Sequence, residues 1–218
     1  GYIGYDWVMI DDEHVFNNDE TMANMIRAAE VANLTPLIRL RDPSPSWCYQ
    51  FLDMGVGGII LSHTESPQEV LDLIDACKFP PEGQRGATSK ARAMKFGLDY
   101  IGQDQRLKEL NAETFLMPLV ETLAGIEQLE AIASVEGVDG VFIGPGDLAL
   151  DMGVPFGSDK VLEKVEQAIA TVVKAGKFPC TISSASMAKS YIDKGVSLIL
   201  AMINYDAPII NWLQEAKA

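Results

Sequence analysis

A chain of 218 residues can bury one large hydrophobic core but is short for two ordinary domains, so we expect a single domain over residues 1–218. Hydrophobic residues make up 48% of the chain and charged residues 22%, and no apolar run is long enough to span a membrane, which predicts a soluble protein. The formal net charge of −14 argues against nucleic acid as a partner, because phosphate binding needs a basic surface.

The cysteines and the first residues bear on the cellular compartment. Cys48, Cys77 and Cys180 are widely spaced, form no CxxC pair, and have only two histidines available to help complete a zinc site. We therefore expect reduced cysteines in a cytoplasmic protein. No basic and apolar leader opens the sequence, so nothing indicates secretion. A small anionic substrate remains compatible with the acidic charge if an arginine or a metal ion supplies a local positive charge.

Short β-branched runs alternate with amphipathic stretches along the chain, a pattern typical of parallel βαβ units. Seven strands are predicted, at residues 7–10, 35–39, 58–61, 115–120, 140–143, 178–183 and 197–203. One intervening helix begins at Ser44, has Pro45 in its first turn and ends at Gly55. Another runs from about residue 158 to 174 and has one apolar stripe, at Val161, Val165, Ile169 and Val172.

The number of strands bears on the architecture. Eight β/α units close into a barrel and seven do not, and this chain begins almost at once with a strand. We therefore expect a (β/α)8 TIM barrel that lacks its first β/α unit in this chain. The alternative is an open doubly wound sheet, but no glycine-rich dinucleotide motif follows the first strand. One irregular stretch, residues 78–103, is rich in glycine, proline and basic residues and is predicted to be a long loop, either functional or disordered.

Several predicted strands end on polar residues that are costly to bury and useful for chemistry. These strand ends carry Asp11, Asp12, Glu13 and His14, then Arg39, then Glu121, and then the turn Gly144-Pro145-Gly146-Asp147. In a parallel barrel the carboxyl ends of the strands converge on one face, where active sites are built. The sequence therefore predicts one polar site at that face.

Glu121 and Asp147 are candidate metal ligands. Carboxylates at the ends of successive strands, with no cysteine nearby, are hard oxygen donors that suit Mg²⁺ or Mn²⁺. The alternative is that each acidic residue caps the helix that follows it. The glycines around Pro145 let backbone amides approach a ligand, so this turn is a candidate carboxylate-binding site at a helix N-terminus.

Two further side chains are candidates for substrate chemistry. A guanidinium at Arg39 can donate to two oxygens of a keto acid or enolate, and a surface salt bridge is the alternative. His14 can move a proton near neutral pH, and Asp53 is a candidate to fix its tautomer; a structural histidine is the alternative. His63 also ends a strand, but the sequence offers no partner for it.

A cationic segment contrasts with the acidic composition. Gln84-Arg85-Gly86 is followed by Lys90 and Arg92. We expect this segment at the substrate entrance, with Arg85 binding substrate. A cluster of intersubunit or solvent salt bridges is an equally good interpretation.

Together these segments resemble the HpcH/HpaI family of metal-dependent pyruvate aldolases, over essentially the whole chain. The similarity lies in Gly4-Tyr5-Asp6-Trp7 running to Asp11-Asp12-Glu13-His14, in Pro36-Leu37-Ile38-Arg39, in Gln84-Arg85-Gly86, in Glu121-Thr122, and in the long specific stretch from Val135 to Leu148. The resemblance implies a barrel of the phosphoenolpyruvate/pyruvate-binding type with a further β/α unit ahead of Gly4. It also implies a homo-oligomer, usually a hexamer assembled from dimers that exchange the C-terminal helix, here about residues 207–218.

The resemblance also implies a role for each candidate residue. Glu121 and Asp147 match the ligands of Mg²⁺, Mn²⁺ or Co²⁺, Arg39 matches the pyruvate-binding arginine, and His14 with Asp53 matches the proton-transfer pair. The backbone amides of Gly146 and Asp147 would hold the carboxylate of a small 2-oxo acid. The implied reaction breaks a carbon–carbon bond of a 4-hydroxy-2-oxo acid through a pyruvate enolate. No lysine ends a predicted strand, which favours the metal route over a Schiff base.

Three departures from the family pattern bear on the substrate. Asp12 replaces a common glycine, Leu119 replaces a common glutamine, and the segment from Ile203 to Asp206 replaces a glycine-rich strand end. They leave two alternatives to the aldolase. One is an oxaloacetate decarboxylase or an enolate-using enzyme similar to macrophomate synthase, and the other is a barrel that binds metal and keto acid without catalysis.

Overall fold

The computed structural model describes residues 1–15, 17–98 and 103–201, in which seven strands form one parallel sheet. The strands are β1 (Trp7–Asp11), β2 (Thr35–Leu40), β3 (Gly58–Leu61), β4 (Phe115–Val120), β5 (Gly140–Ile143), β6 (Phe178–Ser183) and β7 (Leu198–Ala201). All seven predicted strands are confirmed. The predicted extension of the last strand to residue 203 and the predicted C-terminal helix at about 207–218 lie outside the described residues.

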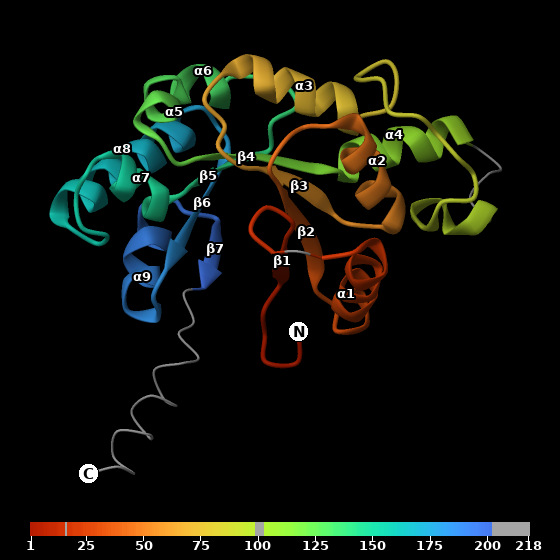
Figure 1. Ribbon diagram of the computed structural model, residues 1–218, viewed down its shortest axis with the longest axis horizontal. Coiled ribbons are helices and arrows are strands. Elements are labelled where there is room, and N and C mark those ends of the chain that lie inside the picture. Colours follow the sequence, from red (N-terminus) through yellow and green to blue (C-terminus); the bar gives the residue numbers. More distant parts are fainter. Residues whose placement is uncertain (16, 99–102, 202–218) are drawn as a thin grey trace, which may run out of the picture.

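Helices follow the strands and lie on the outer side of the curved sheet (Figure 1). They are α1 (Asp19–Val31), α2 (Pro45–Met54), α3 (Pro67–Cys77), the 3₁₀ helix η1 (Arg92–Gly97), α4 (Gln103–Glu113), α5 (Leu123–Glu127), α6 (Leu129–Ala133), α7 (Pro145–Asp151), α8 (Asp159–Lys174) and α9 (Ala185–Asp193). None of the helices in the described part of the chain is long and apolar enough to cross a membrane.

The strand order separates the two predicted architectures. Each strand pairs in parallel with the next strand in the chain, from β1 through β7. A doubly wound sheet reverses its strand order at a switch point, so that alternative is wrong. The sheet curls into a nearly closed barrel of the TIM-like type. Within the described residues, β1 and β7 each pair with a single neighbour, so the sheet keeps two edges.

The helix boundaries follow the predicted local signals. Ser44 is the N-cap of α2, Pro45 is its first residue, and Gly55 ends the helix in the left-handed conformation with φ of 101°. A left-handed residue lets the backbone N–H groups reach back to the last carbonyls of the helix, and glycine adopts this conformation without a steric penalty. The predicted apolar stripe of α8 is buried.

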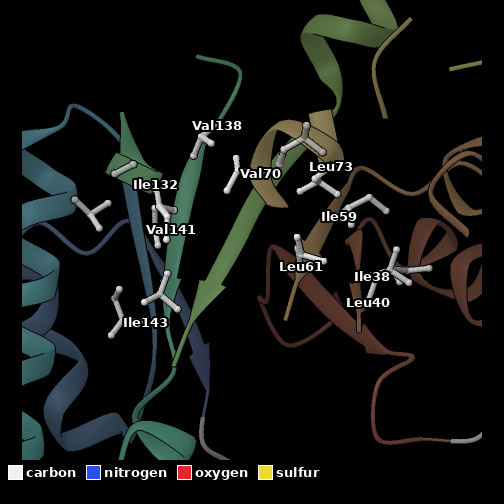
Figure 2. Packing of buried hydrophobic residues seen from close by; sticks show 14 of the residues in the cluster. Ile38, Leu40, Ile59, Leu61, Val70, Leu73, Ile132, Val138, Val141 and Ile143 are labelled. Atoms are coloured by element: carbon white, nitrogen blue, oxygen red, sulfur yellow. The ribbon is translucent and has the colours of Figure 1, made fainter. Parts of the chain in front are cut away.

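Alternation along the strands divides the hydrophobic core into two parts. Outward-pointing strand residues such as Ile38, Ile59 and Ile143 pack against the helices, as Figure 2 shows. The alternate residues form a smaller cluster, Leu37, Ile60, Met117, Leu119, Phe142 and Cys180, against which Trp7, Met9, Leu198 and Leu200 pack. Successive side chains of a strand point to opposite faces. This smaller cluster is therefore the interior of the barrel.

The same alternation fixes which polar residues face inward at the carboxyl ends of the strands. Asp11 follows Met9 by two residues, Arg39 follows Leu37 by two, and Glu121 follows Leu119 by two. Each belongs to the inward-facing set of its strand. We call the opening of the barrel at the carboxyl ends of its strands the barrel mouth. Two carboxylates and one guanidinium, from the ends of three strands, point into it.

Two valines of α8 provide a matched test of this packing. We expect Val165→Ala to lower the free energy of unfolding by about 2 kcal/mol, because Val165 is fully buried and its truncation leaves a cavity. Val173 lies on the same helix with its side chain largely outside the core, and Val173→Ala should cost less than about 0.5 kcal/mol. Urea unfolding measures both values, and equal losses would contradict the assignment of the buried face.

Candidate active site at the carboxyl ends of the strands

An arginine held by two acidic residues occupies the mouth on the side of β1 and β2. The register places Asp11 beside Arg39. The Nε and Nη2 atoms of Arg39 donate to the two carboxylate oxygens of Asp11 at 3.0 and 2.5 Å, and its Nη1 lies 3.1 Å from Oε2 of Glu13. All three side chains are largely buried. A planar guanidinium with two carboxylates around it is fixed in position and orientation.

The surroundings of Asp11 and Arg39 favour the charged form of both side chains. Burial alone would raise the pKa of Asp11, but the hydrogen bonds from Arg39 and from the backbone N–H of Glu13 outweigh it and leave the pKa lowered. For Arg39, burial would lower the pKa, whereas the hydrogen bond with Asp11 and the charges of Asp11, Glu13 and Glu121 raise it. Arg39 is therefore a permanent cation. Arg39 does form salt bridges, with Asp11 and Glu13, but these side chains are only 15–20% exposed and lie inside the mouth. The alternative of a surface salt bridge is therefore wrong.

Glu121 is a buried carboxylate surrounded by negative charge. It follows β4 directly and is only 4% exposed. Its Oε1 accepts a hydrogen bond from the backbone N–H of His63 at 3.0 Å, and Nδ1 of the His63 ring lies 3.5 Å away. Burial raises the pKa of Glu121, and the charges of Asp147 and Glu13 raise it further, against a smaller lowering by the His63 N–H.

The second metal candidate, Asp147, lies in the first turn of α7. Gly144 is the N-cap of this helix, and a side chain at Gly144 would lie 2.8 Å from Cβ and 2.9 Å from Oε2 of Glu121. Helix capping does not account for Glu121, because Thr122 caps α5 through the N–H of Gly125. Gly144 is thus required where the start of α7 meets Glu121 after β4, because any side chain at this position would displace the carboxylate.

The turn after β3 connects the two halves of the mouth. Ser62 donates through its hydroxyl to Oε2 of Glu13 at 2.9 Å, while the next residue, His63, holds Glu121. Beyond this turn, Glu65 accepts a hydrogen bond from the hydroxyl of Thr122. The capping box that starts α3, made by Ser66 and Glu69, follows directly. Hydrogen bonds therefore link the helix starts behind Glu121.

His14 lies at the rim of this group. Its Nε2 is 3.3 Å from Oε2 of Glu13, and the side chain is 63% exposed. The predicted partner, Asp53, lies elsewhere, in the last turn of α2. That helix starts at the carboxyl end of β2 and carries the chain away from the mouth, by about 15 Å over its ten residues. The predicted pairing of His14 with Asp53 is therefore wrong within one chain, and Glu13 takes that position.

Arg85 is also away from the predicted site. Its side chain is 2% exposed, donates to Oδ1 of Asp53 at 2.7 Å and lies over the ring of Phe79. It lines a cavity of about 630 Å³ together with Gly57 and Thr114, which precede β3 and β4. These residues mark the amino ends of the strands, about 20 Å from the mouth for a six-residue strand. The predicted contact of Arg85 with substrate at the mouth is wrong within one chain.

Sequence reasoning missed four residues that hold the site together. Asp11 and Glu13 were noted as polar, but their contacts with Arg39 were not predicted, and Ser62 and His63 received no role. The alternation from Trp7 and Met9 was a sufficient signal for Asp11, since it places that residue on the inner face. No comparable signal marks Ser62 and His63, whose contacts depend on the conformation of one turn.

The donors at the mouth fit a hard divalent cation. Glu121 and Asp147 supply carboxylate oxygens, and their mutual repulsion is the charge imbalance that a cation would neutralise. In the described parts of the chain, no three side chains of His, Cys, Asp or Glu converge as a complete metal shell. Mg²⁺ and Mn²⁺ often bind through one or two carboxylates, with water and substrate completing the coordination. Two protein ligands are therefore sufficient for such an ion.

Comparison with known proteins gives the family. A sequence model described as HpcH/HpaI aldolase/citrate lyase matches residues 1–196. The chain is 38% identical over 179 residues to the hydroxypyruvate/pyruvate aldolase of Roseovarius nubinhibens, covering 80% of this chain and 67% of that protein. It is 32% identical over 221 residues to the 4-hydroxy-2-oxo-heptane-1,7-dioate aldolase of Shigella sonnei, covering 99% and 81%. The chain belongs to the HpcH/HpaI aldolase/citrate lyase family, and the predicted resemblance is confirmed.

The fold agrees with this assignment. The crystal structure of an HpcH/HpaI aldolase from Desulfitobacterium hafniense matches the chain with a TM-score of 0.89 at 23% identity, over 99% of this chain and 84% of that one. At this identity the match bears on the fold alone. The sequence match to the family shows that the protein is an enzyme of an aldolase/lyase family, whose members generally depend on a divalent metal ion.

Two glycines of one turn test the geometry around Glu121. Gly144→Ala places Cβ under 3 Å from Glu121, so the carboxylate must move, and we expect Mn²⁺ affinity to fall by about tenfold or more. Gly146 has no atom within 4 Å of an added Cβ, and Gly146→Ala should leave Mn²⁺ affinity unchanged. Isothermal titration calorimetry compares the two. Equal affinities would show that Gly144 does not constrain the ligand.

Proposed function

We propose that the protein is a divalent-metal-dependent aldolase that cleaves a 4-hydroxy-2-oxo acid into an aldehyde and pyruvate, or forms that bond in the reverse direction. One observation carries the proposal: the buried carboxylate of Glu121 and the half-buried carboxylate of Asp147 share one barrel mouth with a fixed cation, Arg39. Carbon–carbon cleavage beside a keto group produces an enolate, which needs positive charge at its oxygen. Relatives named as aldolases for hydroxypyruvate, pyruvate and a hydroxy-oxo-heptanedioate support this substrate class.

The carboxylates and the α7 turn account for substrate binding. Glu121 and Asp147 would hold Mg²⁺, Mn²⁺ or Co²⁺, which supplies Lewis-acid polarisation of the keto group. The backbone N–H groups of Gly146 and Asp147 lie in the first turn of α7. The first N–H groups of a helix have no acceptor within the helix and can donate hydrogen bonds to an anion. They would bind the carboxylate of the 2-oxo acid and so fix its orientation.

Arg39 and His14 account for the movement of charge and protons. Asp11 and Glu13 keep the guanidinium of Arg39 charged and in place, so that it donates hydrogen bonds to the oxygen on which negative charge develops. His14 would take the proton of the C4 hydroxyl as the bond breaks, with Glu13 orienting the ring.

Three properties of the whole protein belong to the same proposal. We infer that a further β/α unit completes a barrel of the phosphoenolpyruvate/pyruvate-binding type, since β1 and β7 each have one unpaired edge among residues 1–15, 17–98 and 103–201. We infer a homo-oligomer, supported by the exposure of Tyr2 and Ile3, which are 91% and 85% exposed. The buried and unpaired cysteines support a reducing compartment such as the cytoplasm.

The central test measures pyruvate release. The protein is incubated with 4-hydroxy-2-oxoheptanedioate or with oxaloacetate, with Mn²⁺ or with a chelator, and pyruvate is followed by coupled NADH oxidation. We expect release from the hydroxy-oxo acid that the chelator abolishes. Faster release from oxaloacetate would favour the decarboxylase alternative, and no release from either substrate would favour a binding protein. Because metal ions alone decarboxylate oxaloacetate, a Glu121→Gln sample is the blank.

Amide substitutions test the metal ligands without disturbing the fold. We expect Glu121→Gln and Asp147→Asn to reduce metal-dependent turnover below about 1% of wild type, because an amide oxygen is a much weaker ligand for a hard cation. Glutamine at position 121 can still accept the His63 N–H. Substantial activity in both variants would remove the proposed metal site.

The metal-free Glu121→Gln protein should also be more stable than the metal-free wild type at neutral pH. The pKa of Glu121 is raised in the folded protein, so its charged form opposes folding above that pKa. The difference should shrink as the pH falls through the raised pKa and vanish below the ordinary value of 4.5, where Glu121 is neutral in both states. Thermal unfolding at several pH values measures this trend.

The guanidinium geometry is tested by a conservative change. We expect Arg39→Lys to lower kcat/KM by about 100-fold or more, because a single ammonium cannot donate to Asp11, Glu13 and a substrate oxygen in one plane. Mn²⁺ affinity should be much less affected, since Arg39 is not a ligand. Steady-state kinetics and calorimetry check both values. Unchanged kinetics would reduce Arg39 to a structural ion pair.

A further inference from the structure

His63 has a backbone conformation that is uncommon for a residue other than glycine. Its φ is 54°, in the left-handed region, where a side chain is crowded by the following carbonyl group. Among the described residues, the other non-glycine residues with positive φ are Asn33, Lys95 and Phe96. These three lie after the end of α1 or inside η1, whereas His63 lies at the carboxyl end of β3, beside the site. Strained backbone that persists at such a place indicates a constraint imposed by function.

The hydrogen bonds on either side of His63 show what the conformation achieves. The N–H of Ser62 donates to the carbonyl of Leu40 in β2, and the N–H of Thr64 donates to the carbonyl of Leu119 in β4. The N–H of His63, between them, donates to Oε1 of Glu121 at 3.0 Å. The turn therefore stays tied to both neighbouring strands while one N–H is directed at a carboxylate.

The backbone of His63, rather than its ring, makes the closer contact with Glu121. Nδ1 of the imidazole lies 3.5 Å from the same Oε1, and the side chain is 60% exposed. Exposed ion pairs contribute little to position or stability, because water screens them. The backbone N–H donates to a carboxylate that is almost fully buried, where a hydrogen bond has few competitors. Removal of the ring should therefore matter less than a change of φ.

The hydrogen bond leaves one oxygen of Glu121 for a cation. Oε1 is engaged by the N–H of His63, and Oε2 lies on the side of Gly144, where no side chain intrudes. A carboxylate held at one oxygen loses less conformational freedom when it binds an ion. The same turn also holds Glu13 through Ser62, and Glu13 contacts Arg39.

We propose that His63 is a positioning residue that acts through its left-handed backbone, which directs its N–H at Glu121 and so presets this carboxylate for a divalent cation. The inference rests on the proposed function, since it presumes a cation at Glu121 and Asp147. It assigns the imidazole no essential part. It also explains why a strained residue persists at the end of β3.

The test compares substitutions that differ in their tolerance of positive φ. His63→Gly and His63→Asn remove the ring, retain the N–H and accept the left-handed region, whereas His63→Val retains the N–H but disfavours that region. Mn²⁺ binding is measured by isothermal titration calorimetry, and the thermal midpoint of the metal-free protein by circular dichroism. We expect Gly and Asn to bind within about threefold of wild type, and Val to bind about tenfold more weakly. His63→Ala, intermediate in tolerance, replaces Val if that variant does not fold.

A kinetic measurement distinguishes positioning from general loss of structure. Saturating Mn²⁺ should restore most of the kcat of the Val variant, because the ligands remain present and only their arrangement is less favourable. Equal Mn²⁺ affinity in Val and wild type would overturn the inference. Weak Mn²⁺ binding by the His63→Gly and His63→Asn variants as well would also overturn it, and would show that the imidazole ring is what positions Glu121. If wild type itself fails to bind Mn²⁺ or binds as weakly as Glu121→Gln, the proposed metal site fails first.

Discussion

Glu121 is a carboxylate that the fold buries beside other acidic groups, and the organisation of the barrel mouth follows from the need to keep it there. Burial and the charges of Asp147 and Glu13 both oppose its ionised form. The fold offsets this with the N–H of His63 and with a guanidinium, Arg39, whose own charge is secured by Asp11. A protein that only needed stability would replace such a group with an apolar one. The arrangement is instead suited to binding positive charge.

The parallel barrel makes this arrangement possible because it delivers alternate residues of each strand to the same interior. Apolar residues such as Met9, Leu37 and Leu119 fill the interior, and the next inward position of each strand carries a polar group, namely Asp11, Arg39 and Glu121. The site therefore rests on a packed interior. Asp11 and Arg39 belong to β1 and β2, whereas Glu13, the Ser62–His63 turn and Glu121 follow β1, β3 and β4, and Asp147 comes from α7.

Much of this could be predicted from the sequence because it depends on local patterns. The seven strands have short apolar cores, and the positions of Glu121, Asp147 and Arg39 at or just beyond strand ends follow directly. The pairing of His14 with Asp53 is not made within one chain, because α2 carries Asp53 to the other end of the barrel. The position of Arg85 could not be predicted, since residues 78–98 have no periodicity to orient them.

The role of the turn after β3 was beyond sequence reasoning for a different reason. Turns that need positive φ usually contain glycine, asparagine or aspartate, and His63 is none of these. Its contact with Glu121 joins residues 58 positions apart. Nothing in the local sequence reports such a contact. The hydrogen bonds from Ser62 to Glu13 and from Thr122 to Glu65 are equally long-range.

The linked caps of α3 and α5 give the mouth one stiff side and one compliant side. Around β3 and β4, the carboxylate of Glu69 accepts hydrogen bonds from the N–H groups of Glu65 and Ser66, and the carboxylate of Glu65 accepts one from the Thr122 hydroxyl. These bonds brace the backbone behind Glu121. On the other side, the segment that carries His14 follows β1, which pairs with β2 alone among the described strands, and His14 and Val15 project into solvent. Adjustment to ligands of different size should fall on this freer rim. Glu121 can then keep its position while His14 adjusts to the substrate that is bound.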